Sequence, residues 1–186
     1  MKKNDHEKDQ PTPLEKLDAK ARAFLSPVMV FISCRNFLRP SHIQLDHLGY
    51  SCSSKEEYEM LKAEYEKRSL IINESIIGGR RILYCAISHL LDVGRGYNKI
   101  EHIEICEPKP QGNWVNGFDH IELYPIKEED FSSVGAHLQS HDAAVAEVLG
   151  NHVVFYVGTF ELKDLKFEVR LRRRHLNKVI ADEQLG

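Results

Sequence analysis

The sequence has little of what marks secreted, membrane or redox proteins. Its four cysteines form no CxxC pair, so we expect them to be buried small apolar residues rather than a redox centre. The start, "MKKNDHEKDQPTP", is too polar for the apolar core of a signal peptide. The longest apolar run, "FLSPVMVFISC", is too short and too interrupted to cross a bilayer. The sequence therefore predicts a cytoplasmic protein without a membrane partner.

No charge of one sign dominates. The chain has 25 Lys and Arg against 28 Asp and Glu, a formal net charge of −3, so nucleic acid is not expected as the main partner. The run "RLRRRH" at 170–175 is better explained as the solvated edge of a strand than as a nucleic-acid patch. With 186 residues and 42% hydrophobic content, the chain can form one compact domain.

An Asp-His pair occurs twice at the head of an apolar strand pattern. The two pairs are Asp46-His47 in "DHLGY" and Asp119-His120 in "DHIEL", 73 residues apart (119 − 46). Each is followed by an apolar helical stripe at the same offsets of 12, 15 and 19 residues from the aspartate. The two stripes are Tyr58, Leu61 and Tyr65, and Phe131, Val134 and Leu138. The shared offsets indicate a duplicated strand-helix module.

The rest of the pattern gives the order β-α-β-β-β twice. We predict a disordered tail at 1–13, a helical leader at 14–40 that breaks before Pro27, a first module at 41–110 and a second at 111–186. The predicted strands are 44–52, 70–74, 81–88 and 99–107, then 117–124, 143–149, 152–160 and 165–172. The predicted helices are 55–68 and 128–140, with a short closing helix at 174–184.

Strict strand alternation predicts one polar face in each module. It places His47 on the side opposite Leu48 and Tyr50, and it places Phe118, His120, Glu122 and Tyr124 on the side opposite Ile121 and Leu123. Such a face is either exposed to solvent or encloses a polar cup. The other histidines, His102 and His175 among them, carry no ligand spacing and are expected on the surface or in loops.

The chain resembles the vicinal oxygen chelate superfamily, which includes glyoxalases and extradiol dioxygenases, and within it the YecM family. The stretches that carry the resemblance are "LDHLGYSC", "NESIIGGRRILYC", "PKPQGNWVNGFDHIEL" and "KVIADEQ", between Ile43 and Gln184. The resemblance implies an α+β fold, in which two βαβββ modules form a curved, cup-shaped mixed sheet with N-terminal helices.

The resemblance also implies a divalent metal ion, which could be Zn, Fe, Mn or Ni. Carried over position by position, the ligands are His47, His120 and the closing-strand carboxylate of Glu168, with Glu104 as an optional fourth. Glu122, two residues beyond His120, is the alternative carboxylate. Two imidazoles and a carboxylate are donors that such ions accept.

The chemistry implied is Lewis-acid catalysis on a small metabolite with two neighbouring oxygens, by a lyase, isomerase or dioxygenase. Glu122 is preferred over Tyr124 as the base. A cationic rim that favours an anionic substrate is expected from Arg80, Arg81, Arg170 and Arg172. The alternative is a metal-free module that binds a small molecule or mediates dimerisation. Modules of this superfamily pair within one chain or between two, which also allows a homodimer.

Overall fold

The structure is a computed structural model that describes residues 10–108, 116–141, 145–149, 152–162 and 165–185. Most of the predicted tail at 1–13 and the predicted boundary between residues 110 and 111 lie outside these residues. None of the described helices combines the length and the apolar character that a membrane span requires.

The leader is a single helix, α1 (Pro13–Ser33), followed by the short 3-10 helix η1 (Asn36–Leu38). Thr12 and Glu15 form a capping box at its start. The predicted break before Pro27 is wrong, because α1 runs through this proline. The buried stripe of α1 continues on both sides of Pro27, and this burial offsets the hydrogen bond that proline cannot donate.

The two predicted modules are present in the predicted order. Ser54 caps α2, since its hydroxyl accepts the backbone N–H of Glu57 at 3.1 Å. The first module consists of β1 (Ile43–Ser51), α2 (Lys55–Lys67), β2 (Ile71–Ile77), β3 (Arg80–Leu91) and β4 (Ile100–Cys106). The second consists of β5 (Gly117–Pro125), η2 (Glu128–Asp130), α3 (Phe131–His141), β6 (Val145–Leu149), β7 (His152–Leu162) and β8 (Leu165–Leu171).

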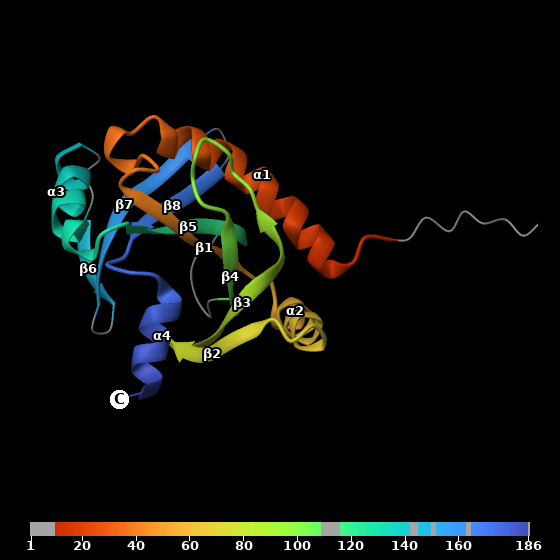
Figure 1. Ribbon diagram of the computed structural model, residues 1–186. Coiled ribbons are helices and arrows are strands. Elements are labelled where there is room, and N and C mark those ends of the chain that lie inside the picture. The colour runs from red at the N-terminus through yellow and green to blue at the C-terminus, as the bar shows by residue number, and fades with distance from the viewer. Residues whose placement is uncertain (1–9, 109–115, 142–144, 150–151, 163–164, 186) are drawn as a thin grey trace, which may run out of the picture.

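The eight strands of the described residues form one mixed sheet in the order β2-β3-β4-β1-β5-β8-β7-β6. The first strand of each module is parallel to the last strand of the same module, and β1 and β5 join the halves as an antiparallel pair. The sheet curves, with α1, α2 and α3 around its outer side (Figure 1). The predicted α+β fold with two βαβββ modules in a curved mixed sheet is confirmed.

The closing helix α4 (Leu176–Leu185) packs near the centre of the sheet rather than among the outer helices (Figure 1). The backbone N–H of Leu176 donates to Asp46 on β1 at 2.8 Å. The amide Nδ2 of Asn177 lies 3.1 Å from Nε2 of His102 on β4. The start of α4 is therefore fastened to the face of the sheet opposite α1.

Candidate metal centre

Each Asp-His pair lies on a β-bulge at the junction of the two modules. In β1, Leu45 pairs with Leu123 and Leu48 with Ile121, so two residues of β1 stand opposite one residue of β5. The second bulge inserts the extra residue in β5, because Gly49 pairs with His120 and Tyr50 with Phe118. A bulge turns two successive side chains to one face. Both aspartates therefore join their histidines on the polar side.

The second bulge also reverses one prediction. Strict alternation places Phe118 with His120, but Phe118 lies on the opposite face, where its ring is 5.6 Å from Phe24 of α1 and 5.0 Å from Tyr50. The prediction is wrong because the extra residue of the bulge shifts the alternation by one place.

The aspartate of each pair lies beside Nδ1 of its own histidine, and Asp119 holds the ring of His120 through a hydrogen bond. Asp119 Oδ1 lies 2.6 Å from His120 Nδ1, and Asp119 Oδ2 accepts the hydroxyl of Ser51 at 2.8 Å. Asp46 Oδ1 lies 3.2 Å from His47 Nδ1, outside hydrogen-bond geometry. A carboxylate on Nδ1 orients an imidazole and leaves Nε2 available, which is the usual arrangement around metal-binding histidines.

The absence of a side chain at residue 49 makes room for His120. A Cβ atom placed on Gly49 would lie 1.8 Å from Cε1 of the His120 ring, and this Gly49 does not have a positive φ. Glycine is therefore required here for close approach and not for backbone conformation.

Three donors from three strands converge in the polar face. The ligand atoms of His47, Glu104 and His120 all lie within 4.8 Å of one another, and the three residues are buried. The two imidazole rings have centroids 6.1 Å apart. Donors that share one ion at about 2.1 Å each can be at most about 4.2 Å apart, so a small contraction would suffice.

His47 provides a further observation that fits an ion. Its side chain is fully buried, yet neither ring nitrogen makes a hydrogen bond to a described residue. The nearest acids, Asp46 at 3.2 Å from Nδ1 and Glu122 at 3.6 Å from Nε2, do not make hydrogen bonds to the ring. Buried polar atoms without a hydrogen bond are uncommon and costly. A bound cation would satisfy a nitrogen of His47, so the donor set of two imidazoles and one carboxylate fits a divalent ion.

Neighbouring charges shift the pKa values of two of the three donors. Burial acts to raise the pKa of Glu104, but the neighbouring His120 and His47 outweigh it and lower the pKa to about 2. Burial and Arg170 act to lower the pKa of His120, whereas Asp119 and Glu104 raise it to about 9. A cation that binds here would displace the proton of His120.

Two arginines of β8 and its C-terminal extension enter the same face. Arg172 donates two hydrogen bonds to the fully buried Glu122, and Arg170 lies 3.5 Å from Glu122 Oε1. Arg170 Nη1 also lies 3.2 Å from His120 Nε2, so this guanidinium and an ion would compete for one nitrogen. Despite burial, Arg172 holds the pKa of Glu122 well below its usual range. Glu122 is thus an ionised, weakly basic carboxylate.

Glu168 and Tyr124, two of the other predicted site residues, lie outside the group of three donors. Glu168 pairs with His120 in register but is not in the group, and its Oε2 accepts Arg170 at 2.8 and 3.0 Å. Tyr124 donates its hydroxyl to Gln44, and burial raises the pKa of its phenol to about 12.

The predicted cationic rim is only partly assembled. Arg170 and Arg172 lie in the cup, and Arg80 Nη1 donates to the backbone carbonyl of Glu107 at 3.4 Å. Arg81 lies outside the cup: it contacts Glu107 at 2.6 Å, and its guanidinium lies over the ring of Tyr58 on α2. Consecutive residues of a strand point to opposite faces, so Arg80 and Arg81 cannot share one.

A second group was missed from the sequence. His102 is buried and His175 is half-buried, so the prediction that they are surface or loop residues is wrong for His102. Their ring nitrogens lie within 4.8 Å of a carboxylate oxygen of Asp46. His175 Nδ1 accepts the backbone N–H of Asn177 at 3.0 Å, so the neutral ring carries its proton on Nε2 and offers no lone pair there. These residues fasten α4 and do not form a second ion site.

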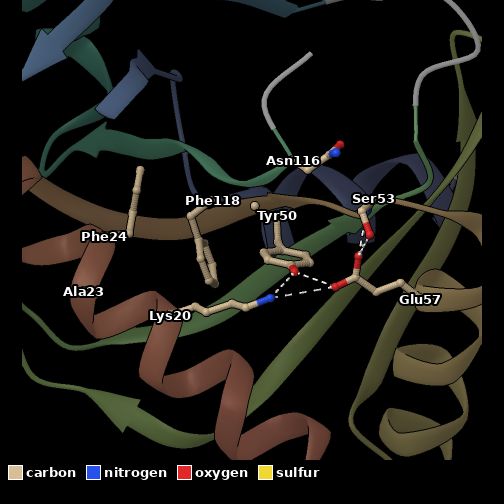
Figure 2. A pocket seen from close by; sticks show the side chains of 9 residues that line it. Lys20, Ala23, Phe24, Tyr50, Ser53, Glu57, Asn116 and Phe118 are labelled. Atoms are coloured by element: carbon tan, nitrogen blue, oxygen red, sulfur yellow. Dashed lines mark hydrogen bonds and ion pairs between the residues drawn. The ribbon is translucent and has the colours of Figure 1, made fainter. Parts of the chain in front are cut away.

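A separate cavity of about 430 Å³ lies on the helix side of β1 (Figure 2). Lys20 of α1 donates to the hydroxyl of Tyr50 at 3.0 Å, which donates to Glu57 of α2 at 2.7 Å. Phe24 and Phe118 line the same cavity. None of its described lining residues belongs to the His47, Glu104 and His120 group.

This arrangement of modules and donors defines a two-module protein of the glyoxalase-like fold with a candidate metal centre at the module junction. A family model described as "YecM protein" matches residues 14–179. The chain belongs to the YecM family.

One solved structure supports the fold. The structural-genomics protein EC4020 is 16% identical over 92% of this chain and 93% of that chain, with a TM-score of 0.64. Methylmalonyl-CoA epimerase from Mycobacterium tuberculosis is 14% identical over 74% of this chain and 91% of that chain, with a TM-score of 0.44. No curated protein matches the chain in sequence.

Proposed function

We propose that this protein is a divalent-metal-dependent enzyme that acts on a small anionic metabolite with two neighbouring oxygen atoms, as a lyase, isomerase or dioxygenase. The observation that carries the proposal is the buried convergence of His47, Glu104 and His120, with both nitrogens of His47 lacking a hydrogen bond to any described residue. Zn, Fe, Mn and Ni all accept this donor set.

When bound, such an ion supplies Lewis acidity at a substrate oxygen. The chain's own residues prepare the site for it. Asp119 fixes the ring of His120, and Gly49 gives that ring its space. Arg170 is the residue that we expect to bind the anionic group of the substrate, because a guanidinium binds a carboxylate or phosphate through two donors. Turning toward substrate would also release His120 Nε2, which lies 3.2 Å from Arg170.

The roles of the predicted bases change with the geometry. Glu122 is held by Arg172 and has a lowered pKa, so it positions the arginines better than it accepts a proton. Tyr124, with a pKa raised to about 12 and its hydroxyl donated to Gln44, stays protonated and does not serve as a base. Glu168 is partly exposed and is paired with Arg170, so it stays a candidate fourth ligand or base once Arg170 moves.

A test of the metal centre uses protein purified without a histidine tag. We expect metal analysis to find about one divalent ion per chain, and we expect Zn, Mn, Ni or Fe(II) to raise the melting temperature of the metal-free protein. The substitutions His47→Ala, His120→Ala and Glu104→Gln should abolish both effects, whereas Glu168→Ala should leave them largely intact.

The outcomes separate the parts of the proposal. If no ion copurifies and none raises the melting temperature, the enzyme proposal fails. If Glu168→Ala removes the ion and Glu104→Gln does not, the metal centre stands and the carboxylate assignment is wrong. His102→Ala serves as the control, because it changes a buried histidine outside the group.

The second candidate function is metal-free binding of a small molecule. Two observations favour it: Arg170 already contacts His120, and the cavity of about 430 Å³ is separate from the histidines. Cavities of this size accommodate small ligands. A ligand whose stabilising effect is unchanged in His47→Ala but lost in Lys20→Ala would support this alternative.

A further inference from the structure

The strand β2 is one end of the eight-stranded sheet and pairs on one side only, with β3, among the described residues. Its side chains are unusually apolar for such a position. Ile72, Ile76 and Ile77 are 41%, 75% and 55% exposed, respectively. An edge strand presents backbone donors and acceptors to any further strand, and proteins commonly protect such edges with lysine or proline. β2 contains neither residue.

The sequence of β2 is nearly palindromic about Glu74. It reads Ile-Ile-Asn-Glu-Ser-Ile-Ile from residue 71 to residue 77. If two copies align antiparallel with Glu74 at the centre, Ile71 stands opposite Ile77, Ile72 opposite Ile76, and Asn73 opposite Ser75. A two-fold interface requires this kind of self-complementarity, because each pair must recur with the two chains exchanged.

The centre of this alignment brings two Glu74 side chains together, and the chain compensates for their charge. Lys62 of α2 donates to Glu74 at 2.6 Å, and Tyr58 donates to it at 3.1 Å. Each Glu74 is therefore already paired with Lys62 before the two chains associate. Like charges that face each other across a strand pair would otherwise oppose association.

The part of β2 that follows Ile72 suits a regular ladder. The register shift between β2 and β3 lies between Ile71 and Asn73, so Ile72 is the extra residue of a bulge, whereas Asn73–Ile77 pair with β3 without irregularity. Exposed apolar strand edges are those that accept a further strand.

We propose that two copies of this chain associate through β2, antiparallel and centred on Glu74, so that their two sheets become one continuous sheet. The occupant of the edge is thus a second copy of the chain, and the buried contacts are the Ile72–Ile76 pairs on one face. The donors of the candidate metal centre lie on β1, β4 and β5, so this association and the proposed function stand or fall separately.

The first test measures mass in solution by light scattering and by sedimentation over a range of concentrations. The wild-type chain should be a dimer. Ile76→Lys, at a side chain that is 75% exposed and therefore dispensable for folding, should weaken association by at least about tenfold. Ile126→Lys, at a 47% exposed isoleucine outside β2, is the matched control and should leave the dimer unchanged.

The second test fixes the register with cysteines in a Cys34→Ser background. Glu74→Cys should form a disulfide between chains under mild oxidation, because the two residues are directly opposite each other. Ile72→Cys alone should not form a disulfide, because residue 72 of one chain and residue 72 of the other would lie about 13 Å apart along the strands. The double variant Ile72→Cys with Ile76→Cys should cross-link again, because residues 72 and 76 are opposite each other.

A wild-type chain that stays monomeric at its highest soluble concentration would overturn the proposal. So would a dimer that Ile76→Lys leaves intact, or a disulfide formed by Ile72→Cys alone and not by Glu74→Cys. Circular dichroism of each variant checks that a change in mass is not a change in folding.

Discussion

Substitution of Gly49 by alanine should disable the metal centre while leaving the fold in place. The added Cβ would lie 1.8 Å from the His120 ring, whereas ordinary contact begins at 3.4 Å, so the ring would have to retreat by about 1.6 Å (3.4 − 1.8). Metal ligands need positions accurate to about 0.5 Å. Loss of an orienting contact alone weakens metal binding by about 10- to 100-fold, and displacement of the ligand itself should cost at least as much.

The same change should destabilise the chain moderately. Insertion of a methyl group into a packed site costs about 1–3 kcal/mol. For a chain of this size that cost corresponds to a melting temperature lower by about 2–12 °C. The assay is titration calorimetry of the metal-free protein with Zn(II), together with thermal unfolding by circular dichroism.

Gly94→Ala is the matched control for Gly49→Ala. Gly94 has a positive φ of 66°, and a Cβ added there would have no atom within 4 Å, so alanine at this position is strained but touches nothing. Its cost of about 1–2 kcal/mol is similar, but metal binding should be unchanged. If Gly49→Ala binds the ion as tightly as wild type, His120 is not a ligand in the position described.

Two further predictions concern the buried ion pair and the proline in α1. Arg172→Met should cost about 3–5 kcal/mol at pH 7, because it leaves Glu122 buried without its main partner. The pKa of Glu122 is lowered in the folded wild type, so its stabilising effect is full well above the unfolded pKa near 4.3 and is lost as pH falls below that value. The difference between variant and wild type in urea unfolding should therefore shrink below pH 4, and an equal difference at pH 7 and pH 3 would contradict this. Pro27→Ala should raise the free energy of unfolding by about 2 kcal/mol. A proline inside a helix destabilises the folded state by about 3 kcal/mol, whereas its restriction of the unfolded chain stabilises the protein by about 1 kcal/mol. A lower melting temperature of the variant would count against this prediction.

Most of the elements could be predicted because their signals are local. The offsets of 12, 15 and 19 residues located α2 and α3, and Tyr58, Tyr65 and Leu138 are buried as the stripes require. The break at Pro27 could not be judged locally, because the packing of the residues around it decides whether α1 continues.

The candidate site was predicted only in outline. Both histidines could be found from the repeated dipeptide, and the structure brings them together. The aspartates could not be placed, because strict alternation sends each to the face opposite its histidine and only the pairing of β1 with β5 reveals the bulges. The repeated Asp-His dipeptide is the signal that could have indicated that the aspartates belong to the site, because the aspartate recurs together with the histidine.

The carboxylate could not be chosen from the sequence. Glu104 and Glu168 both stand on a closing strand, and alternation places both on the polar face. What distinguishes them is Arg170, two residues from Glu168, which contacts the oxygens of that side chain and leaves Glu104 beside His120. Such a preference depends on rotamers and not on spacing.

The attachment of α4 has a practical consequence for work on this protein. Since the backbone of Leu176 donates to Asp46, whose neighbour is His47, the last segment of the chain buttresses the centre of the molecule. Purification tags and fluorescent fusions at the carboxyl end would be attached directly to α4 and could disturb its packing against the sheet, whereas the amino end leads into the outer helix α1. Termination of the chain just after Arg172 would remove α4 and all of its contacts with the sheet.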